Sequence, residues 1–223
     1  MIVTPALLEQ RVDLQKNQLV QLSRFYSRFQ IDIADNTLVP NTTTQLDKLF
    51  ESSFFNLVSR ATFDFHLMVS EPIRHINLIK LLPKKRVGFI LIHKPVFPDY
   101  QLLSTTYPHF KFGLVLNPED DVNALDKELL KKLSSIQIMT IVPGFQGNAF
   151  IENSLTKIEQ LKKRSYLGEI IIDGSVNEKT VPIILSKKYK PDVLGIGSYL
   201  TKSPPEDLIR RVEYLKRKTT STE

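Results

Sequence analysis

The chain has 223 residues, a length that a single α/β barrel fills, and its content of 42% hydrophobic and 24% charged residues allows a sizeable folded core. It contains no cysteine, which excludes disulfides and thiolate metal sites, so a metal would bind through histidine, carboxylate or amide groups. The net charge of +6 suits an anionic ligand. The basic residues fall mainly on expected helix faces and in the C-terminal tail, without an RNA-recognition or zinc-finger signature, and we therefore expect no nucleic-acid partner.

Membrane and export signals are the next class to consider. No stretch approaches the roughly 18 apolar residues that a membrane span needs. The opening residues, MIVTPALLEQRVDL, lack a basic segment followed by a long apolar run. We expect a cytoplasmic protein with no membrane partner.

Apolar runs of strand length recur eight times along the chain. They cover residues 2–7, 30–35, 63–69, 87–93, 110–117, 136–142, 169–174 and 192–198. Leucine and isoleucine at helical spacing mark intervening helices, over residues 44–58, 71–82, 122–133, 150–164 and 205–217. This alternation predicts one (β/α)8 barrel domain over residues 1–217, with an open doubly wound sheet as the competitor, and residues 218–223 as a frayed tail.

Polar side chains gather where several of the predicted strands end. They are Asp32, Asp35, His66, His93, Asn117 and Asp173. Chemistry in a barrel collects at these ends, although turns and helix caps favour the same residue types, so each residue alone is weak evidence.

Glycines form a second pattern at the last three predicted strand ends. These are Gly144, Gly147, Gly174, Gly195 and Gly197. Glycine lets backbone N–H groups approach an anion closely, and barrels often hold a phosphate after strands seven and eight. The three neighbouring glycine loops together predict a phosphate site.

Six segments, read in order, resemble the motifs of the ribulose-phosphate 3-epimerase family. They are IDIADNTLVPN, HLMVSEP, LNP, VPGFQGNAF, IDGSVN and GIGSYL, and they span nearly the whole chain. Members of that family are TIM barrels that interconvert ribulose 5-phosphate and xylulose 5-phosphate, removing the proton of the third carbon from one face and returning one to the other. The resemblance implies a carbohydrate epimerase with a sugar-phosphate substrate, and a homo-oligomer.

The resemblance assigns the two proton-transfer roles to Asp32 and Asp173, on strands nearly opposite in the ring. Family members hold a divalent metal of the Zn, Fe, Mn or Co class with two histidines and two aspartates. Asp32, His66 and Asp173 match three of these positions, while Gln30 stands in place of the first histidine. A glutamine oxygen is a weaker ligand than imidazole, so we expect weakened metal binding. Gln30 shares a strand face with Asp32 and would ligate through its oxygen or hydrogen-bond the enediolate without a metal.

Pocket and phosphate contacts are also implied. They come from Met68, Met139, Gly144, Gly147, Gly174, Ser175, Gly197 and Ser198. The chain departs from the family pattern at Ala6, Glu9, Ala34, Gln146 and Ser175, and Ser175 carries a steric cost if its position requires a positive φ. Asp35 is expected to shape a loop. His75, His93 and His109 match no catalytic position and are expected to be packing or surface residues.

Three alternatives stay open at this point. The first is an epimerase of a related ketose phosphate such as allulose 6-phosphate. The second is a catalytically degenerate sugar-phosphate binder, suggested by Ala6, Glu9, Gln30 and Ala34 but opposed by retention of both aspartates and His66, because mutually repelling buried carboxylates serve no purpose in a binder. The third is a lyase or decarboxylase with an Asp-x-Lys-x-x-Asp motif, which Ala34 disfavours because it stands where the lysine is required.

Overall fold

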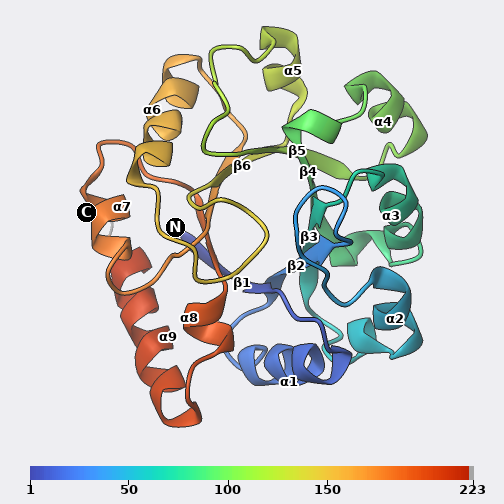
Figure 1. Ribbon diagram of the computed structural model, residues 1–223, viewed down its shortest axis with the longest axis vertical. Helices are drawn as coiled ribbons and strands as arrows, with labels where there is room; N and C mark the ends of the chain where they lie inside the picture. Colours follow the sequence, from blue (N-terminus) through green and yellow to red (C-terminus); the bar gives the residue numbers. More distant parts are fainter. Residues whose placement is uncertain (221–223) are drawn as a thin grey trace.

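The computed structural model describes residues 1–220, and its eight parallel strands form a closed barrel (Figure 1). The strands are β1 (Ile2–Leu7), β2 (Arg28–Ala34), β3 (Thr62–Met68), β4 (Val87–His93), β5 (Lys111–Leu116), β6 (Ser135–Met139), β7 (Glu169–Asp173) and β8 (Val193–Ile196). Each strand pairs with the next along the chain, and β8 pairs with β1. The predicted (β/α)8 barrel is therefore confirmed, and the open sheet is excluded because its edge strands would remain unpaired.

Helices surround the barrel on its outside (Figure 1). They are α1 (Val12–Leu22), α2 (Leu46–Glu51), α3 (Pro72–Ile79), α4 (Tyr100–Thr106), α5 (Lys127–Lys132), α6 (Thr156–Lys163), α7 (Val181–Ser186), α8 (Ser198–Thr201) and α9 (Pro205–Thr220). Short 3-10 turns accompany them, at η1 (Phe54–Asn56), η2 (Lys84–Arg86), η3 (Lys94–Val96) and η4 (Glu152–Leu155). No helix within residues 1–220 is both long and apolar enough to cross a membrane.

Several predicted helices are shorter than their apolar periodicity indicated. The segment 44–58 divides into α2 and η1 because Ser53, with φ of 58°, adopts a left-handed conformation between them. The segment 122–133 is helical only from Lys127, where the Asp126 side chain accepts a hydrogen bond from the Leu129 amide and caps the helix. Residues 150–164 likewise divide into η4 and α6.

The last helix is longer than the sequence indicated. α9 continues to Thr220, and Thr219 is buried there, with its backbone oxygen accepting a hydrogen bond of 3.3 Å from the amino group of Met1. Residues 218–220, assigned to a frayed tail, are therefore helical. Residues 221–223 lie outside the described part of the chain.

Strand β2 shows how the barrel positions polar groups. Its apolar residues Phe29, Ile31 and Ile33 belong to the core between barrel and helices, whereas Gln30 and Asp32 lie on the opposite, inward face. The alternation in RFQIDIA therefore places amide and carboxylate groups inside the barrel while the strand stays fully packed outside.

The amino end of the barrel interior is closed by an ion-pair network. The Arg28 guanidinium donates hydrogen bonds of 2.7 Å to Asp64 and of 2.7 Å to Glu169. Asp64 is fully buried and also accepts a hydrogen bond of 2.8 Å from the Phe89 amide. A buried carboxylate is thus held by a full positive charge and a backbone donor at this end.

Candidate active site

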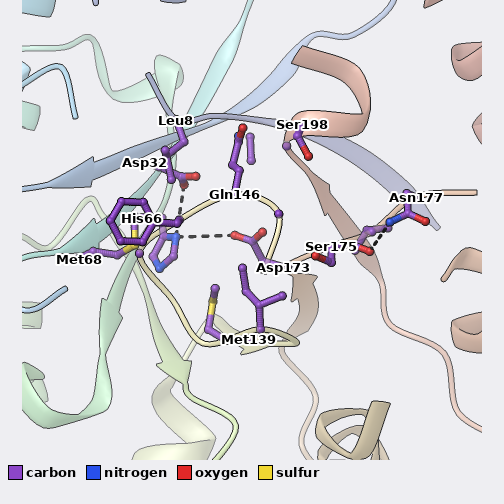
Figure 2. Close-up of a pocket in the computed structure, with 18 residues that line it drawn as sticks. Leu8, Asp32, His66, Met68, Met139, Gln146, Asp173, Ser175, Asn177 and Ser198 are labelled. Atoms are coloured by element: carbon purple, nitrogen blue, oxygen red, sulfur yellow. Dashed lines mark hydrogen bonds and ion pairs between the residues drawn. The ribbon is translucent and has the colours of Figure 1, made fainter. Parts of the chain in front are cut away.

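A cavity of about 210 Å³ opens at the carboxyl ends of the strands (Figure 2). It is lined by all eight residues expected to contact substrate or phosphate, namely Met68, Met139, Gly144, Gly147, Gly174, Ser175, Gly197 and Ser198. The loop after β6, yellow in Figure 1, passes across the mouth of the barrel above it. The predicted pocket residues, dispersed over more than a hundred positions, thus share one cavity.

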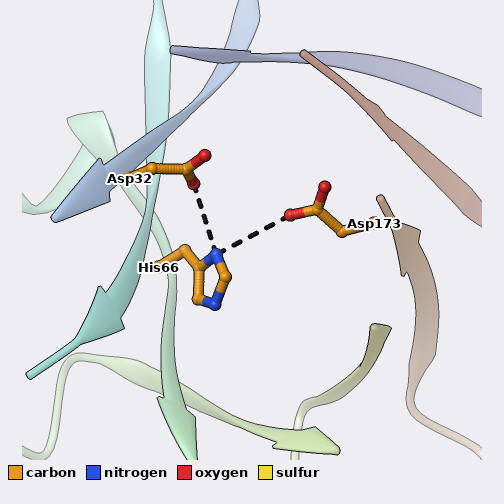
Figure 3. A group of neighbouring side chains, drawn as sticks. All are labelled: Asp32, His66 and Asp173. Carbon is orange, nitrogen blue, oxygen red and sulfur yellow. Dashed lines mark hydrogen bonds and ion pairs between the residues drawn. The ribbon is translucent and has the colours of Figure 1, made fainter. Parts of the chain in front are cut away.

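Asp32, His66 and Asp173 converge on the cavity floor from β2, β3 and β7 (Figure 3). Nδ1 of His66 lies 3.3 Å from Oδ1 of Asp32 and 3.7 Å from Oδ2 of Asp173. All three side chains are buried. The structure therefore brings together the three residues that the resemblance grouped from distant parts of the sequence.

Gln30 lies beside this trio but does not line the cavity. Its Nε2 donates a hydrogen bond of 2.8 Å to Oδ1 of Asp32 and another of 2.6 Å to Oδ2 of Asp173. The same oxygen of Asp173 also accepts a hydrogen bond of 3.0 Å from Nε2 of Gln137 on β6. The sequence suggested that Gln30 would offer its oxygen to a metal or contact the intermediate, whereas its NH2 group faces both carboxylates.

His93, at the end of β4, connects His66 to Asn117, which follows β5. The sequence alone did not indicate this connection. Its Nε2 lies 2.9 Å from Nε2 of His66, and its Nδ1 lies 3.0 Å from Oδ1 of Asn117. His93 is buried, as a packing residue would be, but its ring also joins the hydrogen bonds of His66. The available signal was its position at a strand end, next to the strand that carries His66.

The hydrogen bonds of His93 orient its own ring and that of His66. Burial, together with the neighbouring His66, lowers the pKa of His93 to about 3, so His93 is neutral. With the Asn117 oxygen accepting from Nδ1 of His93, its Nε2 accepts from His66. Nδ1 of His66 is then the ring nitrogen that faces the two carboxylates.

Asp173 has an environment that suits proton exchange. Burial first, and the adjacent Asp32 carboxylate second, raise the pKa of Asp173 to about 6, while His66 and the hydrogen bond from Gln30 act in the opposite direction. A carboxyl group with such a pKa holds and releases a proton closer to neutral pH than an ordinary aspartate does.

Left-handed backbone shapes the glycine-rich rim of the cavity. Gly144, Gly147 and Gly174 have φ values of 121°, 94° and 118°, and Ser175 has a φ of 51°. At Gly174 a Cβ would approach the Ile141 side chain to 2.7 Å, so no larger residue fits. The expected steric cost at Ser175 is confirmed, because a residue with a Cβ occupies left-handed space there.

Gln146, in the same rim, has a polar group without a partner. Both polar atoms of its amide are buried and accept or donate no hydrogen bond within residues 1–220. The side chain lies against the cavity (Figure 2). A bound polar ligand would supply the missing partners, because buried amides are rarely left unpaired.

Two other expectations concern the ends of β1 and β2. Asp35 shapes its loop as expected, because its Oδ1 accepts a hydrogen bond of 3.1 Å from the Thr37 amide and another from the Thr37 hydroxyl. Ala6 lines the cavity, whereas Glu9 accepts a hydrogen bond of 2.6 Å from Gln18 on α1. Loss of a hydroxyl at residue 6 leaves that wall of the cavity apolar.

The buried Asp32, His66 and Asp173 group could hold a metal ion. One ligand atom from each residue lies within 4.8 Å of the others. Two carboxylate oxygens and an imidazole nitrogen are donors that divalent transition metals accept. The donor chemistry of these three residues fits a metal, but the Gln30 NH2 group, turned toward the same oxygens, is not a ligand in this orientation.

Comparison with known proteins places the chain in a family. The family model described as "Ribulose-phosphate 3 epimerase family" matches residues 2–200. A ribulose-phosphate 3-epimerase of Bacillus subtilis (strain 168) is 31% identical over 180 residues, covering 76% of this chain and 78% of that protein. The ribulose-phosphate 3-epimerase of Encephalitozoon cuniculi (strain GB-M1) is 27% identical over 177 residues, covering 78% of this chain and 75% of that protein.

Solved structures support the fold alone. The 3-hexulose-6-phosphate synthase of Salmonella typhimurium superimposes with a TM-score of 0.67 at 12% identity, covering 98% of both chains. The match of the family model over most of the sequence is more specific than this shared barrel. The chain belongs to the ribulose-phosphate 3-epimerase family.

Proposed function

We propose that the protein interconverts D-ribulose 5-phosphate and D-xylulose 5-phosphate. The observation that carries the proposal is the convergence of Asp32 and Asp173, from separate strands, on the floor of a cavity rimmed by left-handed glycines. Inversion at one carbon needs an acid and a base on opposite sides of the substrate. Family membership, with curated relatives named ribulose-phosphate 3-epimerase, supports this substrate pair.

The two carboxyl groups divide the proton transfer between them. In one direction Asp32, as a carboxylate, removes the proton from the third carbon, and Asp173, in its protonated form, delivers a proton to the opposite face. The reverse reaction exchanges the two roles. The raised pKa of Asp173 supports its holding a proton while Asp32 is ionised.

The intermediate of this reaction is an enediolate, whose negative charge needs stabilisation. If a divalent metal of the Zn, Fe, Mn or Co class is bound by Asp32, His66 and Asp173, it would supply this stabilisation by polarising the adjacent carbonyl as a Lewis acid. The neutral chain of Asn117 and His93 keeps the His66 ring oriented beside the two carboxylates.

The rim of the cavity anchors the substrate. Backbone N–H groups at Gly147, Gly174, Gly197 and Ser198, which line the cavity, would bind its phosphate, with Gly144 and Ser175 holding the loops. The unpartnered amide of Gln146 would donate to phosphate or hydroxyl oxygens. Met68 and Met139 supply an apolar wall that keeps water from the reacting carbon.

Incubation with ribulose 5-phosphate in heavy water tests the proposal. We expect deuterium at the third carbon and formation of xylulose 5-phosphate, and Asp173→Asn should slow the interconversion by at least about 100-fold. Allulose 6-phosphate, assayed in parallel, distinguishes the related substrate. If no deuterium enters ribulose 5-phosphate with or without added zinc, manganese or iron, the proposed function is wrong.

A further inference from the structure

Gln30 occupies the position of a metal-binding histidine, yet it makes a different interaction. One amide nitrogen lies 2.8 Å from Oδ1 of Asp32 and 2.6 Å from Oδ2 of Asp173. An NH2 group carries two hydrogens, and each is directed at one carboxylate. The opposite orientation, with Oε1 against two carboxylate oxygens, would be repulsive, so the neighbours themselves fix the amide.

The two oxygens that Gln30 engages are the ones that face His66. Oδ1 of Asp32 and Oδ2 of Asp173 are the atoms lying 3.3 Å and 3.7 Å from Nδ1 of His66. A cation bound among these three atoms would meet the hydrogens of the Gln30 amide. To offer its oxygen instead, Gln30 has to rotate its amide and break both hydrogen bonds. We call the two hydrogen bonds from Gln30 to Asp32 and Asp173 the amide bridge. Metal binding and the amide bridge therefore compete.

Like a bound cation, the amide bridge reduces the repulsion between the two carboxylates. Gln30 and Gln137 together donate three hydrogen bonds to the carboxylate pair, two of them to Oδ2 of Asp173. Hydrogen bonds to ionised groups are stronger than neutral ones and relieve repulsion between the two negative charges. Both amides are fully buried, which strengthens this effect.

We propose that Gln30 is a carboxylate-bridging residue that takes the place of the metal, so that the protein binds divalent metal weakly and transfers protons without one. The catalytic half of this inference rests on the proposed epimerase function. The metal-binding half does not, because it concerns only the affinity of the Asp32, His66 and Asp173 group for a cation. Gln30 itself acts by holding the two carboxylates, and is a positioning residue.

The first test measures metal affinity directly. Chelator-treated protein is titrated with Zn²⁺ and Mn²⁺ by calorimetry, and the parent is compared with Gln30→His. We expect the variant to bind at least about tenfold more tightly, because an imidazole ligand replaces an amide whose charged hydrogen bonds had to be broken. Gln101→His, which adds an imidazole on the exposed start of α4, controls for surface binding and should leave the affinity unchanged.

The second test follows deuterium entry into ribulose 5-phosphate in the presence of chelator. The parent should retain its exchange, whereas Gln30→Met, similar in length but without donors, should lose it although its circular dichroism is unchanged. Tight stoichiometric metal in the purified parent, equal affinities for parent and Gln30→His, or exchange that chelator stops and metal restores would overturn the proposal. If the parent catalyses no exchange under any condition, the epimerase function and the catalytic half fail together, while the titration still decides how Gln30 affects metal binding.

Discussion

Two residues of β2, Arg28 and Gln30, each bridge carboxylates inside the barrel, but at opposite ends. At the amino end Arg28 joins Asp64 of β3 to Glu169 of β7 through hydrogen bonds of 2.7 Å. At the carboxyl end Gln30 joins Asp32 to Asp173 through bonds of 2.8 Å and 2.6 Å. The geometry is similar and the charge is not, since guanidinium is a full cation and the amide is neutral.

This difference separates a structural site from a reactive one. Around Arg28 the negative charge of Asp64 is compensated by a cation, so its carboxylate is held in place. Around Gln30 two buried carboxylates lie together without a lysine or arginine partner among residues 1–220, and burial first, with repulsion from Asp32 second, raises the pKa of Asp173. Proton transfer needs the second arrangement, because a fully paired carboxylate is a poor base.

The largest difference between the two ends is expected when one carboxylate is removed at each end of β7. Asp173→Asn should lower the rate of pentulose phosphate interconversion by roughly 100- to 10,000-fold, because it removes one of the two acid/base groups. Glu169→Gln, at the other end of the same strand, should leave the rate nearly unchanged. A coupled assay for xylulose 5-phosphate measures both. Equal losses in the two variants would show that the rate depends on strand integrity and not on the carboxyl group.

Removing the cation at the amino end should affect stability instead. Arg28→Met leaves the buried Asp64 charge without its cation, which should lower the free energy of unfolding by about 3 kcal/mol. Urea denaturation measures this change. Arg11→Met, which breaks an exposed ion pair with Asp13, should leave the free energy of unfolding almost unchanged. If both arginine variants have similar stability, the network around Arg28 does not carry the role assigned to it.

The carboxyl end should also make a pH-dependent contribution to the stability of the protein. The folded-state pKa of Asp173, about 6, lies above the ordinary value of about 3.9, so between these values the native state binds a proton that the unfolded state has released. The resulting stabilisation is complete below about pH 4 and is lost as the pH rises to about 6. In chelator, the unfolding free energy of the parent should therefore fall relative to Asp173→Asn across this window. Parallel curves for the two proteins would contradict the raised pKa.

The smallest expected effect concerns the hydrogen-bonded histidines. His93→Phe keeps a ring but removes the bonds to His66 and Asn117, and should slow interconversion roughly tenfold by releasing the His66 ring. Nitrogen NMR of the His66 ring should show the altered tautomer. His75→Phe, on α3 and away from the trio, should leave both unchanged. An unaltered His66 spectrum in His93→Phe would remove the basis for this positioning role.

Sequence patterns identified the barrel and most of the cavity because both depend on local and repeated features. Apolar runs of strand length marked the strands, and strand-end aspartates with glycine loops marked the cavity rim. The contacts of His93 and Gln137 could not be predicted, because they depend on the register between neighbouring strands. The helix boundaries near Ser53 and Asp126 depended on a single backbone conformation and a single cap, which periodicity does not report.

The orientation of the Gln30 amide also depends on contacts between strands, which the sequence does not show. The sequence placed it correctly beside Asp32, since residues two apart share a strand face. It did not show which end of the amide faces the carboxylates. That choice depends on Asp173, which lies 143 positions away along the chain and reaches Gln30 only in the closed barrel.

The most direct test of the two-carboxylate account is proton exchange at the third carbon, measured in heavy water from each epimer separately. The parent should exchange and interconvert both. Asp32→Asn should still exchange the proton of one epimer and Asp173→Asn that of the other, with neither variant interconverting them, because each carboxyl group serves one face. If both variants exchange the same epimer, or either interconverts the two at a rate close to that of the parent, the two aspartates do not act on opposite faces of the substrate.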